Sequence, residues 1–113
     1  MSQHAVIVEF VEYGKRFFTQ EANDLIPLFE FEDELEAAVC AAGAGELDGH
    51  EITSDGSLGY IYLYGEDADA LFKSVEPVLL ESPVAMGCKV TLRYGAAGAA
   101  GVRETVKDVA VRH

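Results

Sequence analysis

Hydrophobic and polar residues follow two different periods along this chain, and each period predicts a kind of element. Residues 5–11 are β-branched or aromatic and almost all apolar, so we expect a strand at the centre of a sheet. Residues 58–64 and 88–94 alternate with a period of two, which predicts two further strands. Residues 46–53 are more polar and predict an edge strand, joined to 58–64 by a turn at 54–57.

A helical period of 3.6 residues begins at Leu28 and continues to Ala42. We expect Gly43 to end this helix, and we expect acidic residues to crowd its first turns, where the helix dipole favours negative charge. The apolar stripe is Leu28, Phe31, Leu35, Val39 and Ala42, and the carboxylates around it are Glu30, Glu32, Asp33, Glu34 and Glu36. A solvated face is the usual interpretation of such a pattern. The absence of Lys and Arg between the acids adds weight to a docking surface.

A second helix is predicted to begin at residues 66–67 and to end before residues 82–83. Because Pro77 lacks a backbone donor, we expect a kink or a short break just before it. The longest irregular connection, residues 15–27, lies between the first strand and the first helix. Its aromatic residues either close the edge of the sheet or take part in binding.

The order strand, helix, hairpin, helix, strand is the split βαββαβ, or ferredoxin-like, arrangement. It predicts an α+β fold in which two helices cover one face of an antiparallel sheet with strand order 4-1-3-2. We divide the chain into one domain over residues 1–94, a Gly/Ala-rich loop over 95–101 and a C-terminal segment over 102–113. We expect this last segment to add an edge strand, with a frayed tail as the alternative.

Acidic and basic residues are separated along the chain. Its 113 residues include 20 Asp and Glu against 8 Lys and Arg, and the net charge is −12. Sixteen of the acidic residues, but only one basic residue, Lys73, lie between Glu21 and Glu81. Such a segment repels nucleic acid and anionic membranes and attracts cationic partners.

The composition predicts a globular rather than a disordered protein, because 50% of the residues are hydrophobic and 25% are charged. No apolar run approaches the roughly 20 residues that span a bilayer, and the N-terminus lacks the basic region of a signal peptide. Cys40 and Cys88 lie far apart in apolar surroundings. We therefore expect two buried free thiols, which suit a reducing compartment.

The sequence shows no catalytic, metal-binding or cofactor motif, so we expect no cofactor and favour a non-enzymatic role. None of the three histidines has a second His or Cys at ligand spacing, which argues against a zinc site. For Asp48, His50, Glu51 and Asp55, an acidic edge and turn is a simpler explanation than a metal site. His50 beside Glu51 is the one passable acid–base pair.

Tyr60, Tyr62 and Tyr64 form a row on one face of a predicted central strand. If the alternate positions face the helices, this row lies on the uncovered face of the sheet. Tyrosine is favoured at interfaces, and such rows stack on RNA bases in some sheets of this topology, although the negative charge argues against nucleic acid. Partner binding, homodimerisation and capping by the C-terminal segment remain open. Residues of the last predicted strand would share this face: Lys89, Thr91 and Arg93.

Three phrases of the sequence together resemble a group of small, acidic bacterial proteins with a ferredoxin-like pattern. They are residues 48–51 (DGHE), 62–72 (YLYGEDADALF) and 75–79 (VEPVL). The resemblance covers residues 46–94. It implies the fold and a bacterial, cytoplasmic setting, and it carries no function and no site residues.

These features predict a non-enzymatic module whose acidic surface binds a basic protein. The most specific hypothesis is an immunity protein that neutralises a basic toxin domain after fast, electrostatically steered association. The predicted contact residues are the helix carboxylates Glu30, Glu32, Asp33, Glu34 and Glu36 and the tyrosines Tyr60, Tyr62 and Tyr64.

Two alternatives stay open. One is a homodimeric small-molecule-binding protein or minor enzyme with its site between the tyrosine row and residues 15–27, which requires a concave, partly apolar pocket. The other is a housekeeping domain whose acidity serves solubility alone. A flat or convex acidic surface without a pocket would favour partner binding over the first alternative.

Overall fold

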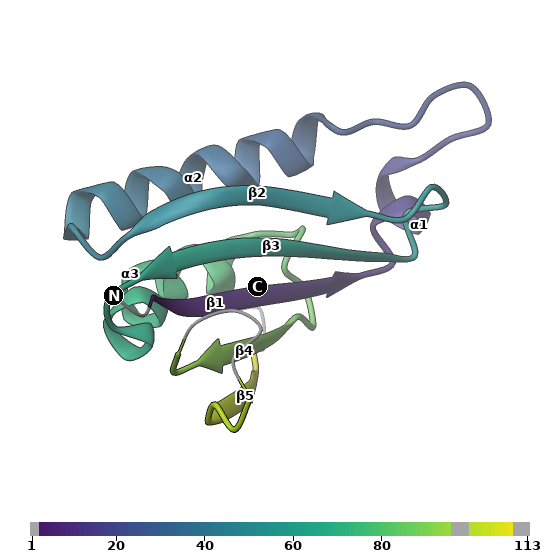
Figure 1. The fold of residues 1–113 in the computed structure, drawn as a ribbon. Helices are drawn as coiled ribbons and strands as arrows, with labels where there is room; N and C mark the ends of the chain where they lie inside the picture. The colour runs from purple at the N-terminus through teal and green to yellow at the C-terminus, as the bar shows by residue number, and fades with distance from the viewer. Residues whose placement is uncertain (1–2, 96–99, 110–113) are drawn as a thin grey trace.

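A five-stranded antiparallel sheet and three helices form a mixed α+β fold in the computed structural model, which describes residues 3–95 and 100–109 (Figure 1). The strands are β1 (His4–Val11), β2 (Glu46–Ile52), β3 (Leu58–Gly65), β4 (Lys89–Arg93) and β5 (Glu104–Asp108). The helices are α1 (Tyr13–Phe17), α2 (Ile26–Ala42) and α3 (Ala68–Glu81).

β1 lies at the centre of the sheet, whose strand order is β2-β3-β1-β4-β5. Each neighbouring pair is antiparallel. The predictions of a central first strand and of an edge strand for β2 are therefore confirmed. β5 confirms a strand within the C-terminal segment, whose residues 110–113 lie outside the described part of the chain, as do residues 96–99 of the Gly/Ala-rich loop.

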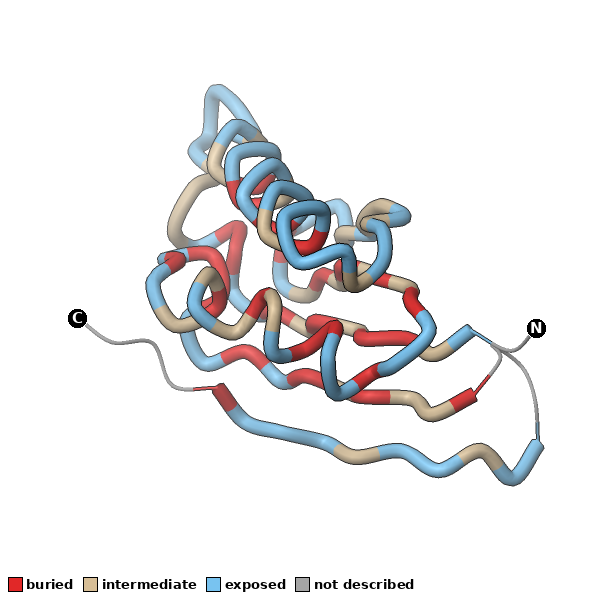
Figure 2. Tube along the Cα trace, turned by 90° about the vertical axis from the view of Figure 1, so that its left-hand side faces the viewer, coloured by how far each residue is buried: buried red, intermediate tan, exposed pale blue. Residues whose placement is uncertain are grey.

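α2 and α3 lie against the same face of the sheet, and the opposite face carries neither helix (Figure 1 and Figure 2). The apolar stripe of α2 faces the sheet, as predicted, through Leu28, Phe31, Leu35 and Val39, which are buried. Burying side chains of this size contributes about 1.5–3 kcal/mol each. Ala42, the last residue of the predicted stripe, is exposed. The core thus fills the space between one sheet face and two helices.

The start of α2 differs from the prediction. Ile26 opens the helix, and its backbone N–H donates to the Asp24 carboxylate at 3.0 Å. Pro27 follows, with a fixed φ that suits a first turn. The first turn therefore contains no acidic residue, and the carboxylates begin only at Glu30. Gly43 ends the helix in the left-handed conformation, with φ 61°, as predicted.

α3 runs without interruption, so the predicted break at Pro77 does not occur. Pro77 is exposed, and water can therefore bond the backbone carbonyl that loses its usual donor. Asp67 caps the start of this helix. Its carboxylate accepts the backbone N–H groups of Asp69 and Ala70 at 3.0 and 3.3 Å.

The connection over residues 15–27 is more ordered than predicted, because α1 occupies its beginning. Tyr13, the first residue of α1, is fully buried. Its hydroxyl donates to the Asp24 carbonyl at 2.7 Å and accepts the Leu28 backbone N–H at 3.1 Å. Burial raises the pKa of Tyr13 above its ordinary value. One phenol therefore joins α1 to the first turn of α2.

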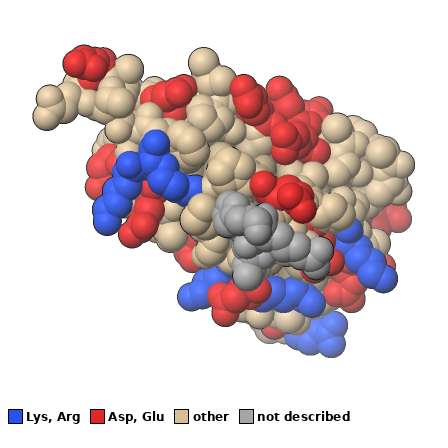
Figure 3. Space-filling model, turned by 180° about the vertical axis from the view of Figure 1, so that it is seen from behind, with Lys and Arg blue, Asp and Glu red and all other residues tan. Residues whose placement is uncertain are grey.

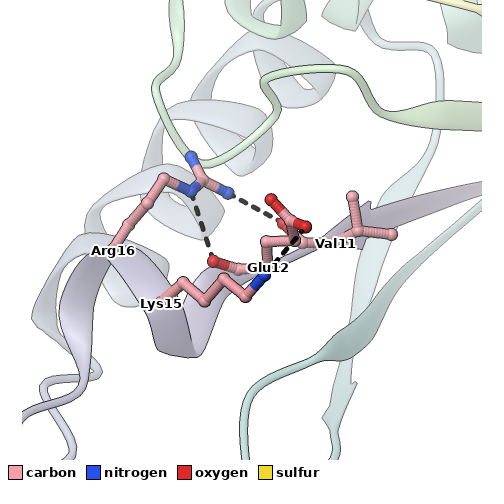
Figure 4. Close-up of polar contacts among 4 residues, drawn as sticks. All are labelled: Val11, Glu12, Lys15 and Arg16. Atoms are coloured by element: carbon pink, nitrogen blue, oxygen red, sulfur yellow. Dashed lines mark hydrogen bonds and ion pairs between the residues drawn. The ribbon is translucent and has the colours of Figure 1, made fainter.

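Arg16 holds α1 to two neighbouring segments through backbone carbonyls, and Figure 4 shows its contacts with Val11 and Glu12. Its guanidinium donates to the carbonyls of Val11 at 3.0 Å and Glu12 at 3.5 Å. It also donates to Pro83 and to Val84, which belong to the turn after α3. Partial burial lowers the pKa of Arg16, and the charge of Glu12 opposes that shift. Arg16 is thus a structural cation rather than a surface charge.

Two glycines let α1 approach the turn between β2 and β3. The Gly14 backbone N–H donates to the Gly56 carbonyl at 2.9 Å. A Cβ atom on Gly14 would collide with the Asp55 carbonyl oxygen. Gly56 has φ 72°, and a Cβ there would lie 2.6 Å from the Gly14 Cα. α1 is therefore held at the end of the sheet where β1 ends, and the start of α2 lies at the same end.

Replacing Tyr13 by Phe should lower the free energy of unfolding by about 1–3 kcal/mol, because the buried Leu28 N–H loses its acceptor. Urea denaturation measures this change. Tyr62→Phe is the control, since it removes a hydroxyl from the face that carries no helix, and its effect should be smaller. Equal effects of the two substitutions would contradict the role assigned to the Tyr13 hydroxyl.

Candidate functional site

Four of the five carboxylates predicted as contact residues point outward from α2. Glu30, Asp33, Glu34 and Glu36 are exposed, because they lie on the faces of α2 that point away from the buried stripe. Within the described residues, no ion pair or side-chain hydrogen bond engages any of the four. Figure 3 shows the molecule from its helix-bearing side, with carboxylates gathered where α2 lies.

Glu32 has a different environment from the other four. It turns toward the edge strand β2, where its Oε1 lies 2.8 Å from Nδ1 of His50, and its side chain is only 13% exposed. Glu32 therefore fixes α2 to the sheet edge. The pair of His50 with Glu51 does not form, because Glu51 lies on the other face of β2, beside Tyr60 and Tyr62.

Large apolar side chains extend the exposed surface at the beginning of α2. Ile26 is 62% exposed and Phe29 is 48% exposed. Both line a hollow of about 660 Å³, to which Phe17 and Leu25 also contribute. Apolar side chains beside charged ones are typical of interaction sites. These two exposed apolar residues and the four exposed carboxylates form one surface, which we call the α2 surface: Ile26, Phe29, Glu30, Asp33, Glu34 and Glu36.

Sequence reasoning missed the apolar part of this surface. Phe29 directly follows the stripe residue Leu28, and Ile26 precedes the predicted start of the helix. The available signal was that Phe29 departs from the 3.6-residue stripe. An apolar residue outside the stripe of an amphipathic helix points away from the core.

The tyrosine row lies on the face of the sheet without helices, as expected from the alternation along β3. The rings of Tyr60 and Tyr62 stack with centroids 6.3 Å apart. Desolvation first, and then interactions with Glu9 and Glu51 respectively, raise the pKa of these two tyrosines. Lys89, Thr91 and Arg93 share this face with Tyr60, Tyr62 and Tyr64.

The small-molecule hypothesis places one site between the tyrosine row and residues 15–27, but these two parts of the chain line different hollows. The hollow beside the connection between α1 and α2 is lined by Phe17 and by residues between 19 and 29. The hollow at Tyr60 measures about 130 Å³ and is otherwise lined by Glu51, Ile52, Thr53 and Leu58. Neither hollow combines the tyrosine row with that connection.

The described residues also limit other kinds of site. Among them, no group of three His, Cys, Asp or Glu is placed to hold a metal ion. No described helix has both the length and the apolar character needed to cross a membrane.

No family model, curated protein or solved structure matches the chain. Function must therefore be argued from the surfaces of this molecule itself.

Reversing one charge on the α2 surface should stabilise the protein. Glu30 and Glu34 are four residues apart on α2 and repel each other, which costs about 0.2–0.5 kcal/mol. Glu34→Lys converts this repulsion into attraction and should raise the free energy of unfolding by about 0.5–1 kcal/mol. Glu34→Gln removes only the repulsion, and its gain should be about half as large. A loss of stability in both variants would show that Glu34 has a stabilising contact.

The two cysteines should differ in reactivity. Cys88 is buried, and burial raises its pKa to about 11, whereas Cys40 is exposed near the end of α2, against the expectation of two buried thiols. We expect one fast-reacting thiol per native chain toward a disulfide reagent at pH 8, and a second only after unfolding. Cys40→Ser should remove the fast phase. Persistence of that phase in this variant would contradict the assignment.

Proposed function

We propose that this protein is a non-enzymatic binding module for a basic protein and that the α2 surface makes the contact. The observation that carries the proposal is the continuity of exposed Ile26 and Phe29 with four carboxylates that have no partner within the described chain. Apolar side chains supply binding energy when a partner covers them, at about 25 cal/mol per Å². The carboxylates select a partner of opposite charge.

The charge of the whole chain supports a basic partner. The net charge of −12 gives a long-range negative potential, and the four exposed carboxylates of α2 add charge that no cation among the described residues neutralises. Electrostatic complementarity of this kind raises association rates from about 10⁵–10⁶ to as much as 10⁸–10⁹ M⁻¹s⁻¹ at low salt. The apolar part of the α2 surface would then slow dissociation, because it is buried only in the docked complex.

The most specific form of this proposal is an immunity protein that neutralises a cationic toxin domain, such as a nuclease. Four carboxylates along one helix present negative charges that a phosphate-binding surface would attract. The free Cys40 and Cys88 thiols are consistent with a reducing, cytoplasmic setting. A toxin that acts on intracellular nucleic acid would have to be bound and neutralised in that compartment.

We also propose that the first four strands, with α2 and α3, follow the ferredoxin-like plan. Support comes from the neighbours β4, β1, β3 and β2, which stand in the order 4-1-3-2 and are all antiparallel. On this interpretation α1 and β5 are additions to the plan. β5 extends the sheet, and α1 sets the start of α2.

Neutralising the α2 surface should impair binding of a cationic protein. The chain is tagged and used to capture proteins from its native cell lysate at low and at high salt, and the captured protein is then purified. The triple variant E30Q/D33N/E36Q should slow its association at least about tenfold at low salt and flatten the salt dependence of the rate, because steering depends on these charges.

The matched control, E46Q/D48N/E66Q, makes the same change in net charge at exposed residues outside α2. It should leave association within about twofold of the unsubstituted protein. Phe29→Ala tests the apolar part and should mainly accelerate dissociation. Unchanged association of the α2 triple variant at low salt would refute this placement of the contact.

A further inference from the structure

The side of α2 that faces solvent carries a second stripe of residues, separate from the buried one. Its members lie alternately three and four residues apart, and all of them are exposed. This spacing places them on one side of a helix and is the spacing by which two packed helices contact each other. We call this set the outer stripe: Ile26, Phe29, Asp33, Glu36 and Cys40.

The outer stripe changes in character from the start of α2 to its end. Two large apolar side chains come first, beside the hollow of about 660 Å³. The carboxylates of Asp33 and Glu36 follow. The end of the stripe is small, because Cys40 has exposed Ala37 and Ala41 next to it. Small side chains let a second helix approach closely, since the distance between two helix axes depends on the side chains at the contact.

We propose that the outer stripe packs along one α-helix of the partner, whose own stripe is apolar, then basic, then small. This inference rests on the proposed function and specifies which element of the basic protein meets α2. From Ile26 to Cys40 the contact extends for about 21 Å, at 1.5 Å per residue. An apolar side chain of the partner helix enters the hollow beside Phe29.

The two carboxylates in the middle of the stripe determine which helix fits. An apolar residue placed over Asp33 or Glu36 would bury a carboxylate that has no partner, whereas Lys or Arg pairs with it. A shift of the partner by one heptad would take its basic residues away from both carboxylates, so the charges also fix the register. A second copy of this chain does not fit, because its outer stripe contains no cation.

Synthetic helical peptides of about 22 residues test this pairing. In one peptide the stripe reads Leu, Leu, Arg, Arg, Ala, and in a second it reads in the reverse order, because a helix can pack in either direction. At least one of them should bind the protein at low salt with a dissociation constant of about 100 μM or less, measured by fluorescence anisotropy. A control peptide has the composition of the first, with its leucines on the opposite face. It should bind at least about tenfold more weakly.

A charge exchange tests the register. The variant D33K/E36K should weaken binding of the stripe peptide at least about tenfold, and a peptide with Glu in place of both Arg should bind this variant within about threefold of the original pair. The matched control, E46K/E66K, makes the same change in net charge at exposed residues outside α2 and should leave binding within about threefold. Far-UV circular dichroism confirms that each variant is folded.

The thiol at the end of the stripe provides a second readout. A saturating stripe peptide should slow alkylation of Cys40 by iodoacetamide at least about fivefold, because the bound helix covers Cys40. The control peptide at the same concentration should leave this rate unchanged.

Failure of both stripe peptides to reach this affinity, or equal binding of the control peptide, overturns the inference. So does a charge exchange that does not restore binding, or an unchanged rate at Cys40. If E30Q/D33N/E36Q nevertheless slows association of the captured protein, the proposed function stands and only the partner helix is wrong. If that triple variant leaves the association unchanged, the proposed function itself has failed.

Discussion

The start of α2 is fixed by one buried hydroxyl, that of Tyr13. It bonds the first turn of α2 to α1, which begins two residues after the central strand ends. An apolar stripe alone holds a helix loosely along its axis, because successive turns present similar ridges. Hydrogen bonds from a fixed phenol remove that freedom. The start of the α2 surface is therefore positioned from the end of β1, where Arg16 and the contact of Gly14 with Gly56 hold α1 in place.

The carboxylates of this molecule have three different roles, and the groups next to each carboxylate determine its role. Glu32 is bonded to His50 and holds α2 to the sheet edge. Glu9 and Glu51 lie beside Tyr60 and Tyr62 on the face of the sheet without helices, and together with desolvation they raise the pKa of these two tyrosines. The exposed carboxylates of α2 have no such partner in the described chain. Net charge alone cannot separate these roles, because each residue contributes equally to it. Burial and the nearest hydrogen-bonding group separate them.

Periodicity predicted the elements well where each one buries a single face. The strands around β1, the stripe of α2 and the orientation of the tyrosine row all follow from alternation that the core enforces. The failures involve contacts between distant segments. Nothing local indicates that Tyr13 reaches Leu28 or that Glu32 rather than Glu51 meets His50. α1 is too short for a helical period to be visible. Ile26 lies in the stretch expected to be irregular, and no pattern in the sequence indicates that its backbone N–H bonds to the Asp24 carboxylate.

The two outer strands leave the sheet with poor templates for further strands. β2 has an irregularity between Leu47 and Gly49, where the pairing shifts by one residue, and exposed acids stand on either side of it. β5 is only five residues long and carries Glu104, Lys107 and Asp108. Irregular backbone and charged side chains both discourage edge-to-edge pairing between molecules. The chain can therefore reach high concentration in its folded state without the sheet growing strand by strand into an aggregate.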